Sequence, residues 1–281
     1  MSEMNDLNSK LLLGLQITIN DVPKEIPSKN VQYDLLRLSL MSQNVYNLKL
    51  LLSLGYSASI VCDSFTLIHQ LLMISPTHVE HLEILVKYGA DINRVDREKR
   101  TPLIMLLEFT WEVEGCWNEM LRALIRNGSK VNSGRLDLDI PLFMAIYNFM
   151  NMETIKILVE EGGADVNYMS ENLHTPLTLC VKLNVDHEIV SYLIDMGANP
   201  DEFIMNRTTP YILAKDEKMK LIMEKQSPKT LSPCAKCLIC CVDIVCVKCK
   251  LMAYCSECIE DYSNNKCPRC FMDTCKRVYI V

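Results

Sequence analysis

Gly163-Ala164-Asp165-Val166-Asn167 and, eight residues further on, Thr175-Pro176-Leu177 are the two short fragments that decide the fold of this chain. Versions of the first fragment begin again at Gly89, Gly128 and Gly197, and versions of the second recur in step with them. The glycines of successive copies are 39, 35 and 34 residues apart, and so are the prolines. Two separate markers that share one irregular spacing predict a repeat array.

Each marker has a physical role at the start or the end of a helix. Thr can accept a backbone N–H as an N-cap, and Pro suits the first helical turn because its missing N–H costs nothing there. The glycine can end a helix in the left-handed conformation, and the polar residues after it favour a turn. Apolar residues lie between the markers at helical spacing, for example Leu82, Leu85 and Val86. Each unit is therefore predicted to be a pair of helices that buries its apolar face by stacking on its neighbours.

These units resemble ankyrin repeats over residues 64–225, and a less regular copy runs from Val31 to Ser59, with Gly55 keeping the glycine spacing. The resemblance implies about five to six repeats over residues 31–225, after an N-terminal segment, 1–30. The histidine that often follows the family's Thr-Pro-Leu is kept only at His69. Ankyrin arrays have no chemistry of their own and bind proteins through hairpin tips and a concave helical face. The basic residues that are substrate-binding candidates at the tips are Arg97, Lys99, Arg100, Arg135 and Arg207. The alternative for each of them is a solvated turn residue.

The repeat with the 39-residue spacing is about five residues longer than the others and contains both tryptophans, Trp111 and Trp117. Insertions in repeats tend to project on one face, and Trp is enriched at binding hot spots. The two rings are therefore substrate-binding candidates. The alternative is that they cover the apolar side of a lengthened helix.

Composition and charge exclude several classes of protein. The chain has 281 residues, of which 49% are hydrophobic, and a net charge of −6, so general disorder is excluded. Residues 229–281 carry 8 Lys or Arg and 5 Asp or Glu, which leaves an acidic main body that argues against nucleic-acid binding. The sequence contains no apolar run of about 18 residues and begins without a basic, signal-like segment. We therefore expect no membrane association and a location inside the cell, in the cytoplasm or the nucleus.

Cysteine is concentrated at the C-terminal end, where 11 of the 14 cysteines lie between Cys234 and Cys275. A Pro/Ser-rich stretch, 226–233, precedes them and is predicted to be a linker. Pairs of cysteines separated by two residues can both reach one zinc ion, and four such pairs within residues 234–270 predict a binuclear, structural zinc domain over 234–281. The alternative is a reduced or disulfide-bonded tail. The candidate ligands are Cys234, Cys237, Cys240, Cys246, Cys249, Cys255, Cys258, Cys267 and Cys270.

This succession resembles a RING finger, in particular the short C-terminal RINGs of the inhibitor-of-apoptosis and Neuralized type. Cys267-Pro268-Arg269-Cys270 looks like the closing Cys-Pro-x-Cys, and the chain ends in an apolar, aromatic-bearing tail, 276–281. The resemblance implies one zinc site from Cys246, Cys249, Cys267 and Cys270, in an all-cysteine variant because Leu251 stands where the family has its histidine ligand. The other site takes Cys255 and Cys258 with one upstream pair. That pair is either Cys234 with Cys237 or Cys237 with Cys240.

A RING-type ubiquitin ligase offers no nucleophile, and it works by holding a ubiquitin-charged conjugating enzyme in an attack-ready pose. By resemblance, that enzyme and ubiquitin are contacted by Ile239, Ile259, Pro268 and, from a partner RING in a homodimer, Tyr279. For these side chains, packing inside the small zinc domain is the alternative. Phe271 stands where many active RINGs carry an arginine, which questions catalytic strength.

The sequence therefore predicts a mostly α protein, an ankyrin solenoid followed by a small binuclear zinc domain. Its predicted activity is that of a RING-type ubiquitin ligase whose repeats recruit the protein substrate. The alternative is a non-catalytic ankyrin adaptor whose zinc module serves dimerisation or recruitment. Similar short ankyrin proteins that end in a RING are encoded by some large DNA viruses, which would make host proteins in the host cytoplasm the targets.

Overall fold

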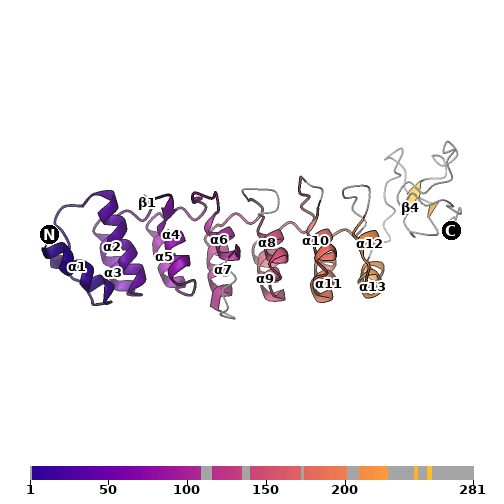
Figure 1. Cartoon of the computed structure of the whole chain (residues 1–281), viewed down its shortest axis with the longest axis horizontal. Helices are drawn as coiled ribbons and strands as arrows, with labels where there is room; N and C mark the ends of the chain where they lie inside the picture. Colours follow the sequence, from indigo (N-terminus) through magenta and orange to yellow (C-terminus); the bar gives the residue numbers. More distant parts are fainter. Residues whose placement is uncertain are drawn as a thin grey trace. The chain divides into compact units, whose positions relative to one another are not determined.

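A computed structural model of the chain describes residues 2–108, 116–134, 140–171, 174–200, 209–226, 244–245 and 252–254. The chain divides into two compact units, Met1–Asp165 and Val166–Val281, which are described separately. In both units the helices occur in pairs (Figure 1). None of the helices in the described ranges is long and apolar enough to cross a membrane.

The first unit contains an N-terminal helix and four helix pairs. Helix α1 (Ser2–Leu12) is followed by the short 3₁₀ helix η1 (Ile19–Asp21), and a two-stranded hairpin of β1 (Val61–Cys62) and β2 (Phe65–Thr66) precedes the second pair. The pairs are α2 (Lys29–Met41) with α3 (Val45–Ser53), α4 (Leu67–Ile74) with α5 (Val79–Lys87), α6 (Pro102–Glu108) with α7 (Cys116–Arg126), and α8 (Pro141–Tyr147) with α9 (Met152–Lys156), which continues into the π-helical turn η2 (Ile157–Glu161).

The second unit continues the same pattern and adds a short hairpin. Its helices are α10 (Pro176–Leu183), α11 (His187–Asp195), α12 (Pro210–Leu213) and α13 (Glu217–Gln226). Strand β3 (Ile244–Val245) pairs antiparallel with β4 (Met252–Tyr254), with Ile244 opposite Tyr254.

The marker fragments form the helix ends that the sequence predicts. Thr175 accepts a hydrogen bond from the backbone N–H of Thr178 at 3.2 Å and begins α10, with Pro176 in the first turn. The marker glycines have positive φ, from +64° at Gly163 to +95° at Gly197, a conformation that costs other residues steric strain. In the upstream copy, α2 and α3 form a helix pair, and Gly55, which follows the C-cap residue Leu54 of α3, has φ +94°.

The core lies between successive first helices. Every side chain from Leu103 to Leu107 in α6 is at most 1% exposed, because α6 packs between α4 and α8. The second helices are buried on one face only, as Leu82 and Leu85 show in α5. Each fully buried apolar side chain contributes about 1.5–3 kcal/mol, so the stacking that the sequence predicts is the main source of stability.

The N-terminal segment is part of this packing. Leu7, Leu11 and Ile17 are fully buried or nearly so, and α1 packs on α2. The Asn47 side chain in α3 fixes the segment, because its amide donates to the carbonyl of Leu15 at 2.9 Å and its oxygen accepts from the backbone N–H of Ile17 at 3.1 Å. Residues 1–30 thus cover one side of the first helix pair, a role that the sequence analysis did not assign to them.

The last residue of each of the first three glycine markers links one repeat to the next. The Asn93 amide donates to the carbonyl of Gly128 at 2.9 Å, while its oxygen accepts from the backbone N–H of Lys130 at 2.8 Å. Asn132 and Asn167 make the same pair of bonds to the following repeat. These links hold the turns of successive repeats in one register.

Candidate protein-binding surfaces

The hairpin tips of the first unit carry an exposed ion pair. Asp63 and Ser64 both have positive φ, as the tight two-residue turn between β1 and β2 requires. The Asp63 carboxylate accepts from the Arg97 guanidinium of the next tip at 2.9 Å, and the two side chains are 79% and 61% exposed. Arg97 therefore lies at a tip as predicted, and so does Lys99, which is exposed with φ +61°.

Arg100 has a different environment from Arg97 and Lys99. Its side chain is only 12% exposed, and its guanidinium contacts the carboxylates of Asp96 at 2.8 Å, Glu108 at 3.0 Å and Glu98 at 3.0 Å. Asp96, whose side chain is 1% exposed, also accepts from the backbone N–H groups of Glu98 and Arg100 at 2.9 Å. The structure gives Arg100 the role of holding its turn together, which leaves little of the side chain for a substrate.

The pKa of Asp96 follows from this arrangement. Burial on its own would raise the pKa of the carboxyl group, but the hydrogen bonds from the Arg100 backbone and guanidinium outweigh it. The pKa of Asp96 therefore lies below its ordinary value, and the group is ionised at neutral pH.

His69 connects this turn to the preceding repeat. Its Nδ1 lies 2.8 Å from the Thr66 hydroxyl and its Nε2 lies 3.1 Å from the carbonyl oxygen of Arg100. Burial lowers the pKa of His69, so the ring is neutral and donates through Nε2. His69 thus bonds the start of its own helix to the turn of the next repeat. His81 in α5 is also buried, with 2% of its surface exposed, and burial lowers its pKa to about 4.

The remaining substrate-binding candidates are placed only in part. Trp117 is half-buried on α7, the second helix of its repeat. Trp111, Arg135 and Arg207 lie outside the described residues.

Two exposed aromatic side chains were missed by the sequence analysis. Tyr147 and Phe149 are 61% and 62% exposed at the turn between α8 and α9, and Phe149 has φ +52°. A bulky side chain rarely adopts this conformation, and the corresponding residue between α10 and α11 is the polar Asn184, with φ +54°. The signal that could have found Phe149 is an aromatic residue at a turn position where the neighbouring repeat has Asn.

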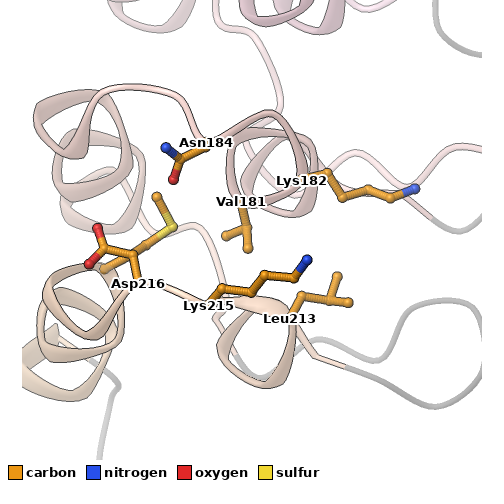
Figure 2. Close-up of a pocket in the computed structure, with 7 residues that line it drawn as sticks. Val181, Lys182, Asn184, Leu213, Lys215 and Asp216 are labelled. Carbon is orange, nitrogen blue, oxygen red and sulfur yellow. The ribbon is translucent and has the colours of Figure 1, made fainter.

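The second unit contains a hollow of about 680 Å³ beside α10. Figure 2 shows its lining, with the Asp216 carboxylate and the Lys182 amine on opposite sides. Asp216 begins α13 by accepting from the backbone N–H of Lys218 at 3.0 Å, and it also contacts Nε2 of His187 at the start of α11. This contact with His187 is the main reason that the pKa of Asp216 is lowered. The lining residues are Val181, Lys182, Asn184, Leu213, Lys215, Asp216 and Met219.

The predicted zinc and conjugating-enzyme residues lie outside the described residues. Within the part of the chain that the structure describes, no group of three or more His, Cys, Asp and Glu side chains could hold a metal ion. Cys62 and Cys180 are free thiols, and burial raises the pKa of Cys180 to about 12, which makes it unreactive at neutral pH. The predicted site residues that lie outside the described ranges are the nine candidate cysteine ligands, Ile239, Ile259, Pro268 and Tyr279.

Comparison with known proteins supports the repeat array. A family model described as ankyrin repeats (3 copies) matches residues 111–204. The structure resembles the ankyrin repeat domain of Bcl-3, described as a unique member of the IkappaB protein family, with a TM-score of 0.58 and 19% sequence identity over 79% of this chain and 91% of that one. It also resembles the human ASB11 ankyrin repeat domain, with a TM-score of 0.53 and 18% identity over 81% of this chain and 98% of that one.

The chain therefore contains ankyrin repeats, and its fold is a mostly helical ankyrin solenoid. Repeats of this kind serve protein–protein interaction, which is the general function that the fold supports. No curated protein sequence matches the chain.

Proposed function

We propose that this protein is a RING-type ubiquitin ligase in which the ankyrin array binds the protein substrate and residues 234–281 hold two zinc ions and dock a ubiquitin-charged conjugating enzyme. The observation that carries the proposal is the arrangement of cysteine pairs around the β3–β4 hairpin. Cys246 and Cys249 fall in the connection between the two strands, and Cys255 directly follows β4. Two thiolates separated by two residues in such a turn can both reach one zinc ion.

The donor set fits zinc. Four Cys-x-x-Cys pairs supply eight thiolates, enough for two tetrahedral sites, and sulfur ligands select zinc over the hard cations magnesium and calcium. Cys246, Cys249, Cys267 and Cys270 would hold one ion, and Cys255 and Cys258 would hold the other with one of the two upstream pairs. Zinc would supply the cross-links that a segment too short for a sizeable core needs in order to fold.

Ubiquitin transfer would then depend on position rather than on a nucleophile in this chain. Ile239, Ile259 and Pro268 would contact the conjugating enzyme, and Tyr279 would contribute from a second copy if the apolar tails pair. The array would hold the substrate, and the linker would decide which of its lysines come within reach.

A second candidate function is a non-catalytic adaptor. Leu251 and Phe271 favour it, because they replace a histidine ligand and an arginine of the resembled RINGs. The adaptor would share the protein-binding array and the zinc ions and would differ in activity alone.

Single-turnover discharge of ubiquitin from a charged conjugating enzyme onto free lysine tests the proposal. The full-length, zinc-loaded chain should accelerate discharge, because a docked enzyme is held in its reactive pose. Cys267→Ala should return the rate to background, since it removes a predicted ligand. Cys275→Ala, which removes a cysteine outside the predicted ligand set, is the matched control and should keep the full rate. No acceleration with any enzyme of a broad panel would favour the adaptor.

A further inference from the structure

In the last described helix pair, α12 with α13, the first helix is about one turn shorter than the first helix of the preceding pair, α10. The N-cap Asn151 lies ten positions after Pro141, and the N-cap Asp186 lies ten positions after Pro176. Asp216, which caps α13, lies only six positions after Pro210. The difference is close to one turn of about 3.6 residues, and α12 accordingly has 4 residues where α10 has 8.

The hollow beside α10 lies where this turn is missing. Val181 and Asn184 from the end of α10 line it on one side, and Leu213, at the last residue of α12, lines it on the other. Val181 and Met219 are 8% and 1% exposed and form an apolar floor. A volume of about 680 Å³ is within the range of about 300–1,000 Å³ found for binding pockets.

The rim of the hollow is basic although the chain as a whole is acidic. Lys182 and Lys215 are both exposed; the Lys182 amine lies 3.0 Å from Nε2 of His174, a neutral partner when the ring accepts, and no described residue forms an ion pair with Lys215. Asp216 is the one acidic residue of the lining, and its carboxylate is engaged by His187 and by the backbone of α13. In Figure 2 the Lys182 amine lies on the far side of the hollow from this carboxylate.

We propose that this hollow is a docking site for a segment of a partner protein that presents one large apolar side chain between acidic residues. The apolar side chain occupies the space of the missing helical turn, on Val181 and Met219. The flanking carboxylates pair with Lys182 and Lys215, which supplies the charge complementarity that selects the partner. The inference rests on the protein-binding role of the repeats and names the class of partner; it does not depend on ubiquitin transfer.

A display library of random dodecapeptides, selected on the immobilised full-length chain, tests the inference. We expect enriched peptides that combine Leu, Ile, Met or Phe with Asp or Glu on both sides. An enriched peptide, labelled with a fluorophore, should bind the wild-type chain with an affinity that falls as salt is raised. The variant Lys182→Glu/Lys215→Glu should bind about tenfold or more weakly.

The matched control is Lys87→Glu/Lys130→Glu, which makes the same change in net charge at two exposed residues of the first unit. It should bind the peptide within about twofold of wild type, because long-range charge effects are screened. Lys182→Gln/Lys215→Gln, checked for an unchanged circular dichroism spectrum, separates loss of binding from loss of fold. Selection without an acidic–apolar consensus, or a consensus peptide equally weakened in both charge variants, would overturn the inference. The assay contains no conjugating enzyme, so its failure and the failure of ubiquitin discharge are distinguishable.

Discussion

Replacing Asp96 with Ala should lower the free energy of unfolding of the first unit by about 2–4 kcal/mol, one of the largest effects expected for a single polar residue in the array. The Asp96 side chain is 1% exposed and accepts hydrogen bonds from Arg100 and from two backbone N–H groups. Its removal takes one of three carboxylate partners from a mostly buried guanidinium and leaves two backbone donors without their acceptor. Urea unfolding of the full-length chain, followed by far-ultraviolet circular dichroism, measures the change.

Asp63→Asn is the control for this substitution, because asparagine tolerates the positive φ that residue 63 adopts. It also removes an aspartate that pairs with an arginine, but both side chains are exposed, so we expect a change below about 0.5 kcal/mol. A double-mutant cycle with Arg100→Ala should give a coupling energy of about 1–3 kcal/mol with Asp96. Equal effects of the two aspartate substitutions would contradict the structural role assigned to Asp96.

The stabilisation by Asp96 should also depend on pH in a defined direction. The folded-state pKa of Asp96 lies below its ordinary value. Its contribution is therefore full above the unfolded-state pKa of about 3.9 and is lost as the pH falls from there through the folded-state pKa. Asp96→Asn removes the titrating group, so the variant should lose less stability than wild type between neutral pH and pH values below about 4.

Removing zinc should abolish ubiquitin discharge while leaving the helical array folded. The predicted ligands all lie within residues 234–270, whereas the helix pairs end at Gln226. A small segment stapled by metal unfolds when the metal is withdrawn, but a stacked repeat array keeps its own core. We therefore expect two zinc ions per chain in native mass spectrometry, and loss of discharge with little change in circular dichroism after chelation.

Single cysteine substitutions locate the ligands in the same measurement. Cys267→Ala should reduce the zinc content below two ions, and Cys275→Ala should retain both. Cys234→Ala and Cys240→Ala then distinguish the two upstream pairs, because only the variant that loses a true ligand should lose zinc. Equal zinc loss from Cys267→Ala and Cys275→Ala would contradict the predicted ligand set.

The repeat array could be predicted from the sequence because its signals are local. Thr175 and Pro176 begin a helix through their own capping chemistry, and Gly197 has the positive φ that its position demands. The sequence also contains a shortened spacing within one repeat, from Pro210 to the cap residue Asp216. This spacing marks the missing helical turn beside which the hollow lies. The distances between repeats do not reveal it, because Pro210 and Gly197 keep the regular spacing of 34 residues from the preceding repeat.

The burial of the Arg100 side chain could not be predicted from local sequence patterns. It stands in a run of charged residues, Arg97-Glu98-Lys99-Arg100, where nothing in the sequence separates exposed side chains from a buried one. The difference arises from the contact of its guanidinium with Glu108 in the following helix, while His69 of the preceding repeat bonds its backbone carbonyl. Such contacts depend on the stacking. The zinc ligands and the conjugating-enzyme contacts lie outside the described residues and stay predictions.

Autoubiquitination of the full-length chain tests the central claim most directly. The chain, shown beforehand to hold two zinc ions, is incubated with activating enzyme, ubiquitin and a panel of conjugating enzymes, with Cys267→Ala as the control. We predict ubiquitin polymers on the chain with at least one conjugating enzyme and none on the Cys267→Ala variant. Absence of polymers with every enzyme, from protein that holds both zinc ions, would contradict the ligase and identify Phe271 as a mark of an adaptor.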